Sequence, residues 1–146
     1  MSKPRFITLH TVGFKGRPID IKDIEMWHRD QGWPHVGYHF YIKYNGIIQK
    51  GIDIEKRGIH VRNNNTGNIG ICFEGNGDLE PITPHQRVSM RYLINRGLRK
   101  EYNIPIKNIR GHNEWPNQNR TCPGSKIDMN EIRDYLKRRE HINIKL

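Results

Sequence analysis

The feature that most constrains the fold is an uninterrupted apolar run at residues 69–73, Ile-Gly-Ile-Cys-Phe, between Asn68 and Glu74. A strand without alternating polar residues is buried on both faces, which is typical of the centre of a sheet. Cys72 in such a strand acts as a small hydrophobic residue. The run therefore predicts a central strand, around which the other elements must be arranged.

Strands and helices alternate along the rest of the chain. Four other segments have the composition of strands: residues 5–9, 37–44, 47–51 and 106–110. Asn45-Gly46 predicts a hairpin between the second and third of these, because both residues tolerate a positive φ angle. Apolar residues at helical spacing predict three helices: residues 21–31, 83–102 and 128–138. The order β-α-β-β-β-α-β-α predicts an α/β fold, with a central mixed β-sheet flanked by about three helices.

The connections and helix ends carry further signals. The first helix suits a right-handed crossover between parallel strands at residues 5–9 and 37–44. Asp20 can cap that helix, Thr83 and Gln86 form a capping box for the second, and Asp128 and Glu131 form a capping pair for the third. We expect the second and third helices to bury the following residues: Val88, Leu93, Ile94, Leu98, Ile132, Tyr135 and Leu136.

Length and composition indicate one globular domain over residues 1–146. The chain has 34% hydrophobic and 27% charged residues, a soluble globular mixture rather than a disordered one. Its length suits one domain built around one core. Cys72 and Cys122 lie in an apolar strand and a Pro/Gly-rich loop, so they do not indicate a disulfide framework.

The chain is strongly basic. Its 25 Lys+Arg residues exceed its 15 Asp+Glu residues by ten, which predicts attraction to polyanions. Nucleic acid, anionic lipid and anionic cell-wall polymers are all candidate partners, and a basic surface that only aids solubility is the alternative. The basic residues are spread along the chain, which argues against nucleic acid.

Neither a signal peptide nor a membrane span is visible. The start, Met-Ser-Lys-Pro-Arg-Phe, has no apolar segment behind its basic residues. No apolar stretch approaches the roughly 20 residues of a membrane helix. We therefore expect a protein without a membrane partner, made and kept in the cytoplasm unless something else releases it.

Two histidines and one cysteine stand out as candidate metal ligands. His10 lies at the end of the first predicted strand, and His112 follows another strand within Gly111-His112-Asn113-Glu114. Enzymes with α/β sheets place their sites at such strand ends. Cys122 comes ten residues after His112. Two imidazoles and a thiolate suit zinc and leave a fourth position for water, although the spacing alone is a weak signal.

Several motifs, in order along nearly the whole chain, resemble those of the zinc N-acetylmuramoyl-L-alanine amidases, which include short phage lysozyme-amidases and catalytic peptidoglycan recognition proteins. The resemblance rests on these stretches: Ile7-Thr8-Leu9-His10, Gly32-Trp33, Val36-Gly37-Tyr38-His39-Phe40, residues 69–76, Gly111-His112 and Thr121-Cys122-Pro123-Gly124. It implies a zinc hydrolase that cleaves the amide bond between N-acetylmuramic acid and L-alanine in peptidoglycan.

The resemblance also implies roles for single residues. It makes His10, His112 and Cys122 the ligands of one zinc ion per chain, and it makes Tyr38 a catalytic residue near the metal. Without it, Tyr38 is an ordinary core aromatic. His60 matches a groove-lining, substrate-binding position in the phage members, and the alternative is a solvated loop histidine.

Arg120 is a departure from the phage pattern. Phage members carry a catalytic lysine two residues before the ligand cysteine, and recognition proteins often have threonine there, whereas this chain has Arg120. Arginine keeps a positive charge but cannot act as an acid or base near neutral pH. Arg120 is our candidate for stabilising negative charge, and Thr121 and Lys126 remain alternatives. Glu114 is a candidate general base, or a group that orients His112.

Four readings of the function remain open. A phage or prophage endolysin, expected to be monomeric and to act on the cell wall after release, fits the basic single domain without a signal peptide. A metal-dependent nuclease rests on the net charge and on His112-Asn113. A non-catalytic peptidoglycan-binding domain is disfavoured because all three ligand positions are filled. An amidase that trims soluble muropeptides is the alternative within the enzyme class.

Overall fold

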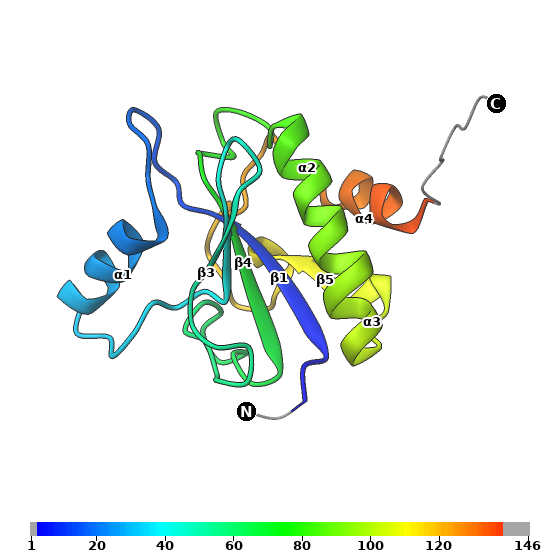
Figure 1. Cartoon of the computed structure of the whole chain (residues 1–146), viewed down its shortest axis with the longest axis horizontal. Coiled ribbons are helices and arrows are strands. Elements are labelled where there is room, and N and C mark those ends of the chain that lie inside the picture. Colours follow the sequence, from blue (N-terminus) through cyan, green and yellow to red (C-terminus); the bar gives the residue numbers. More distant parts are fainter. Residues whose placement is uncertain (1–2, 139–146) are drawn as a thin grey trace.

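A five-stranded mixed sheet in the order β3-β2-β4-β1-β5 forms the centre of the computed structural model, which describes residues 3–138 (Figure 1). The strands have these bounds: β1 Phe6–Thr11, β2 Phe40–Ile42, β3 Ile48–Lys50, β4 Asn68–Phe73 and β5 Ile109–Gly111. β4 is the middle strand and every residue in it is buried, as the apolar run predicts. The fold class is therefore confirmed.

The register of the sheet places the C-terminal ends of β1, β4 and β5 together. β1 runs parallel to β4 on one side and to β5 on the other, with His10 opposite Cys72. β2 runs parallel to β4 and antiparallel to β3, with which it forms the predicted hairpin at Asn45-Gly46. β1 and β2 are parallel to each other, as predicted, but β4 lies between them.

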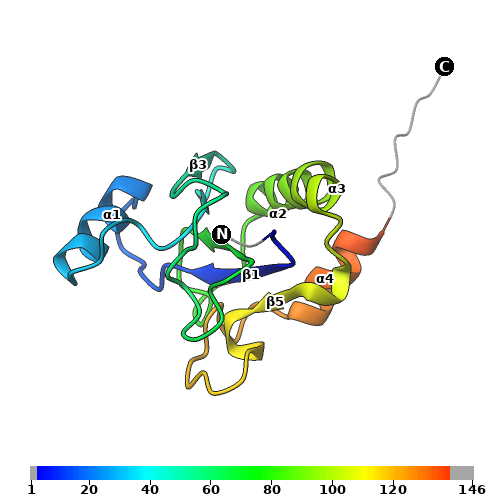
Figure 2. The same cartoon turned by 90° about the horizontal axis from the view of Figure 1, so that it is seen from below.

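Helices cover the sheet on both sides. They have these bounds: α1 Ile21–Asp30, α2 Pro84–Arg91, α3 Arg99–Tyr102 and α4 Met129–Lys137. A π-helical stretch, Tyr92–Leu98, joins α2 to α3, and single 3-10 turns lie at Ile106–Asn108 and His112–Glu114. β1 and β3 lie between α1 and the α2–α3 helix in both views, and β5 lies near α4 (Figures 1 and 2). No helix among residues 3–138 is long and apolar enough to cross a membrane.

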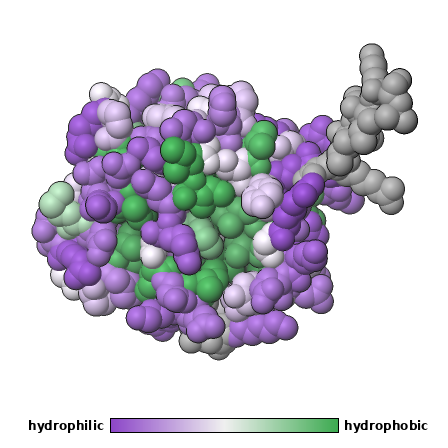
Figure 3. Space-filling model, in the orientation of Figure 1, coloured by the Kyte–Doolittle hydropathy of each residue, from purple (hydrophilic) through white to green (hydrophobic). Residues whose placement is uncertain are grey.

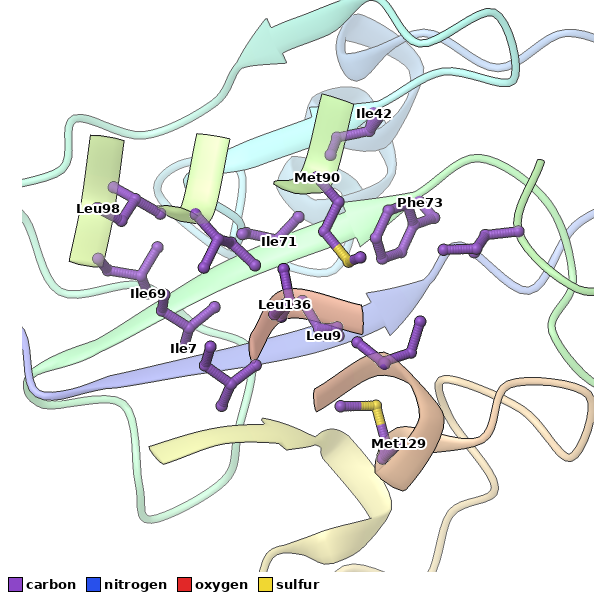
Figure 4. Close-up of a cluster of buried hydrophobic side chains, with 14 of the residues drawn as sticks. Ile7, Leu9, Ile42, Ile69, Ile71, Phe73, Met90, Leu98, Met129 and Leu136 are labelled. Atoms are coloured by element: carbon purple, nitrogen blue, oxygen red, sulfur yellow. The ribbon is translucent and has the colours of Figure 1, made fainter. Parts of the chain in front are cut away.

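The two faces of the sheet have different roles because side chains alternate along a strand. Ile7 and Leu9 of β1 pack with Ile69 and Ile71 of β4 against α2, the π-helical stretch and α4, in the main core (Figure 4). The intervening side chains point to the other face, where Cys72 joins a smaller cluster with Ile24 of α1. His10 belongs to this second set.

The predicted caps at Thr83 and Asp128 are present, whereas the Asp20 side chain makes no capping hydrogen bond to α1 and instead accepts from Lys43 and Gln49. The Thr83 hydroxyl accepts a hydrogen bond from the Gln86 N–H, and the Gln86 side chain accepts one from the Thr83 N–H. Asp128 accepts from the N–H groups of the first turn of α4. The Glu131 carboxylate, however, binds the Arg87 guanidinium, so the reciprocal half of that predicted pair is replaced by an ion pair between α4 and α2.

The prediction that Val88 is buried is wrong. Gln86, Met90 and Ile94 share the face of α2 and its extension that meets the sheet, because residues four apart lie above one another. Val88 lies two residues out of that phase and is 65% exposed. Hydrophobic surface is visible among hydrophilic side chains on the face that carries α2 (Figure 3). Leu98, in contrast, is buried as predicted.

Candidate active site

The predicted ligands meet at the C-terminal edge of the sheet. His10 is the fifth residue of β1, His112 directly follows β5, and Cys122 lies in the next loop. One ligand atom from each lies within 4.8 Å of the others, although Cys122 is 112 positions from His10 in the sequence. The parallel register of β1 and β5 explains this, because it brings both strand ends to one edge.

The spacing of these atoms fits a metal ion. His10 Nδ1 lies 3.7 Å from Cys122 Sγ. Nitrogen and sulfur ligands on one tetrahedral ion with ordinary bond lengths lie about 3.5 Å apart. Three protein ligands of this kind leave one tetrahedral position for water or substrate, as in catalytic sites. The three side chains therefore form a candidate metal site.

The same residues are uncharged without a metal. Burial, and then the neighbouring His60, hold the pKa of His10 well below its ordinary value, and burial also lowers the pKa of His112. Both imidazoles are thus neutral at pH 7 and each has a lone pair to offer. Burial raises the pKa of the Cys122 thiol to about 11. Metal binding at this site must therefore release the thiol proton.

His60 lies directly beneath His10. Its Nδ1 is 3.0 Å from His10 Nε2, and its Nε2 is 2.8 Å from the backbone oxygen of Asn68. The ring is only 8% exposed, which excludes the solvated alternative. Burial lowers the pKa of His60 to about 3, so its ring is neutral as well. His60 also contributes to the wall of the groove described below.

The other ligand, His112, has a partner that the sequence did not reveal. Its Nε2 lies 3.0 Å from Gln118 Oε1. Glu114, which we expected to act as a base or to orient His112, is instead bound by Arg133 of α4 at 2.7 and 2.9 Å and by the N–H of Gly111. An amide in an irregular loop has no periodicity or motif that would have identified Gln118.

Tyr38 lies beside the metal site. Its ring centroid is 5.0 Å from that of His10, and the residue lines the groove just before β2. Burial, with the nearby Cys72 thiol, raises the pKa of the phenol well above its ordinary value. The hydroxyl therefore keeps its proton at neutral pH, with the Cys72 thiol as a hydrogen-bonding neighbour.

Arg120 lines the groove, as does a second cation, Arg62, whereas the two alternatives to Arg120 have other surroundings. Arg120 is exposed and lines the groove, and its charge adds to burial in lowering the pKa of His112 and partly offsets the burial that raises the pKa of Cys122. The Thr121 hydroxyl donates to Asp78 at 2.7 Å. Lys126 lines a separate depression beside α4. Of the three candidates, Arg120 is the one placed to meet a bound anion.

The loop that carries Cys122 is held by close packing and by Asp78. Asp78 accepts hydrogen bonds from the Thr121 hydroxyl and from the N–H of Ser125. Gly77 and Gly124 are in backbone contact, since a Cβ on Gly124 would lie 2.0 Å from the Gly77 carbonyl carbon. The ligand cysteine thus lies on a fixed segment.

These side chains share one groove with a volume of about 640 Å³. The predicted site residues Tyr38, His60 and Arg120 line it together with the three candidate ligands. Two histidines, a cysteine, a phenol and cationic side chains in one groove at a sheet edge are the residue types of a metal-dependent hydrolase, so the groove is a candidate site of that class on a mixed α/β sheet.

Comparison with known proteins identifies the family. The family model for N-acetylmuramoyl-L-alanine amidase matches residues 1–125, so this chain belongs to the N-acetylmuramoyl-L-alanine amidase family. The endolysin of Klebsiella phage KP32 is 35% identical over 81 residues, which are 52% of this chain and 54% of the endolysin. The endolysin of Escherichia phage T7 is 37% identical over the same shares. The chain therefore aligns with about half the length of these relatives.

Solved structures support the same placement. The N-acetylmuramoyl-L-alanine amidase LysC from Clostridium intestinale has a TM-score of 0.82 and 30% identity, covering 92% of this chain and 85% of LysC. Drosophila PGRP-LB has a TM-score of 0.76 and 22% identity, covering 86% of this chain and 78% of that one, which shows a shared fold. None of these comparisons favours the nuclease alternative.

Proposed function

We propose that the protein is a zinc-dependent amidase that cleaves the bond between N-acetylmuramic acid and L-alanine in peptidoglycan. The observation that carries the proposal is the convergence of His10, His112 and Cys122 in the groove of a chain that belongs to this family. The catalytic unit comprises the single sheet and its helices, and we propose that it acts as a monomer over residues 1–146.

Zinc is the metal that suits these ligands best. Two imidazoles and one thiolate, with an open fourth position, are a common catalytic zinc set, whereas harder ions prefer oxygen. His10, His112 and Cys122 would hold the zinc ion, which would lower the pKa of a bound water to about 7 and polarise the amide carbonyl. The protein residues around it must then orient the substrate and stabilise the charge that develops.

Tyr38 and Arg120 carry these two tasks in our proposal. The Tyr38 hydroxyl, protonated at neutral pH, donates a hydrogen bond to the carbonyl oxygen as that oxygen becomes negative. The Arg120 guanidinium adds a fixed positive charge at the exposed side of the groove. Both groups act most strongly on the transition state, where the oxygen carries the most charge.

The relatives support a proposal for the biological setting. Their names describe them as phage endolysins, and we propose the same role here: lysis of the bacterial wall after release from the cell that makes the protein. The substrate is then intact peptidoglycan, with His60 in the wall of the substrate groove and the positive surface attracted to anionic wall polymers.

Mass spectrometry of the products released from purified sacculi tests the proposal. Cleavage should release stem peptides with a free L-alanine amino group and leave glycan chains with intact glycosidic bonds. Chelation of the metal should abolish release, and added zinc should restore it. Products cut within the glycan or within the stem peptide would contradict the assigned bond, and release that persists after exhaustive chelation would contradict the metal.

A further inference from the structure

The hydrogen-bond partners of His60 determine which of its ring nitrogens donates and which accepts. The backbone oxygen of Asn68 is only an acceptor, so His60 Nε2, at 2.8 Å from it, must carry the proton. The neutral ring then has a lone pair at Nδ1, which accepts the hydrogen bond at 3.0 Å from His10 Nε2. It follows that His10 holds its proton on Nε2 and leaves Nδ1 free, the atom that lies 3.7 Å from Cys122 Sγ.

A hydrogen bond from His112 to Gln118 places the proton of His112 on Nε2 as well. The Gln118 Nε2 donates to the backbone oxygens of Arg62 and Pro116 at 3.1 and 3.3 Å, and both partners are acceptors only. The amide oxygen therefore faces His112, and His112 Nε2, 3.0 Å away, must be the donor. His112 likewise keeps its lone pair on Nδ1.

Two glycines leave space for the His60 ring against the face of the central strand, β4. A Cβ on Gly70 of β4 would lie 2.8 Å from His60 Cγ, and a Cβ on Gly58 would lie 2.8 Å from His60 Cδ2. Asn65 accepts hydrogen bonds from the N–H of His60 and from that of the next residue, both at 2.8 Å. These contacts fix the backbone and the ring of His60 together.

We propose that His60 and Gln118 are positioning residues that hold both ligand imidazoles in the Nε2–H tautomer, so that Nδ1 of each faces the metal. The inference rests on the proposed metal site, and it assigns His60 a role beneath the ligand in addition to its place in the groove wall. Partners of this kind fix ring orientation and raise ligand basicity, and their removal typically lowers metal affinity about 10–100-fold.

The wild-type protein offers the first test. Long-range proton–nitrogen NMR of protein with 15N-labelled histidine, recorded without metal at neutral pH, should show protonated Nε2 on His10, His60 and His112. The zinc-loaded protein should show coordination through Nδ1 of His10 and His112. A proton on Nδ1 of His10 or His112 in the metal-free protein would overturn the inference.

Two matched pairs of variants give the second test. His60→Asn keeps an acceptor near the position of Nδ1, whereas His60→Leu has nearly the same shape without it. Gln118→Glu keeps an acceptor for His112, whereas Gln118→Met has the same length without one. Zinc affinity, measured by competition with a chromophoric chelator, should fall about 10–100-fold in the Leu and Met variants and stay near wild type in the Asn and Glu variants.

Thermal unfolding of each metal-free variant separates folding from metal binding. If His60→Leu does not fold, the Gln118 pair and the wild-type spectra still decide the question. Wild-type zinc affinity in both His60→Leu and Gln118→Met would refute the positioning role while leaving the amidase proposal intact. Conversely, a protein that binds zinc through Nδ1 but does not cleave the amide would refute the proposed function alone.

Discussion

Tyr38 and Arg120 can donate hydrogen bonds in the groove, but neither can act as a base near neutral pH. The Tyr38 phenol keeps its proton, and the Arg120 guanidinium cannot lose one near neutral pH. The only carboxylate that we considered as a base, Glu114, is bound by Arg133. At the scale of single residues, the proposed chemistry therefore depends on stabilising negative charge on the substrate, with the attacking water supplied by the metal.

Tyr38→Phe should lower kcat by about 10²–10³ while zinc content and the melting temperature stay near wild type. The change removes one hydroxyl and retains the ring that packs beside His10. Steady-state kinetics on a soluble muropeptide, with zinc measured in the same samples, checks this. A variant with full turnover would show that the phenol is a packing residue.

Arg120 can be tested by two substitutions that differ in charge. Arg120→Ala should reduce turnover, whereas Arg120→Lys should retain much of it if positive charge alone matters. If the planar guanidinium instead binds a substrate carboxylate with two hydrogen bonds, Arg120→Lys should raise KM and leave kcat near wild type. Unchanged kinetics in Arg120→Ala would remove the residue from the mechanism.

The two cysteines should behave differently. Cys122→Ala should abolish stoichiometric zinc binding, because only two of the three ligands remain. Cys72→Ala removes a fully buried sulfur in the cluster beneath α1, so it should lower the free energy of unfolding by about 1 kcal/mol and leave zinc content unchanged. Metal analysis and urea unfolding of both variants measure these outcomes. Loss of zinc from both variants would mean that the substitutions disturb the fold and do not act through the metal ligand alone.

The secondary elements are held to one another by a few buried polar side chains, of which Gln86 is the clearest. Its amide N–H groups donate to the backbone oxygens of Ile42 and Glu74, at the ends of β2 and β4, while its oxygen accepts from Thr83. One side chain thus caps α2 and fixes that helix to two strands. The Glu74 oxygen and the Thr83 N–H depend on this partner, whereas the Ile42 oxygen also accepts from the Glu74 N–H.

Gln86→Met should lower the free energy of unfolding by about 2–4 kcal/mol, since it removes the hydrogen-bond partner of the Glu74 oxygen and of the Thr83 N–H. Val88→Ala, on the opposite side of the same helix, should change it by less than about 0.5 kcal/mol because Val88 is exposed. Urea unfolding of the two variants gives the comparison. Equal losses would mean that α2 is held by its propensity rather than by its contacts.

The sequence predicted those features that depend on neighbouring residues, but it did not predict those that depend on contacts between distant parts of the chain. The capping box at Thr83 and the hairpin at Asn45-Gly46 depend on neighbouring residues, so the sequence reveals them. Val88 was misplaced because the inward face of a helix depends on its contact with the sheet. The three ligands follow from motifs, whereas Gln118 belongs to no motif and its orientation depends in part on Arg62, 56 positions away. The order of the strands in the sheet could not be predicted either, because β4 lies between β1 and β2, which both precede it in the sequence.

The whole molecule carries a net charge of +10, and its effect should depend on ionic strength. Surface charges are largely screened beyond about 8 Å at physiological salt, so binding to anionic sacculi should weaken as salt rises. Pull-down on sacculi over a salt series measures this. Turnover of a small soluble muropeptide is the control and should change less. If binding to sacculi does not change with salt concentration, the affinity comes from the groove and not from the net charge.

The placement of the ligands on opposite ends of the chain links catalytic competence to the completion of folding. His10 and Cys122 are 112 positions apart, and closing a flexible loop of that length costs about 4 kcal/mol of chain entropy. An unfolded or partly synthesised chain therefore cannot gather the three ligands, and a chain truncated before Cys122 lacks one of them. The proposed wall-degrading activity should therefore be absent during synthesis and begin only when the loop that carries Cys122 has packed against the folded sheet.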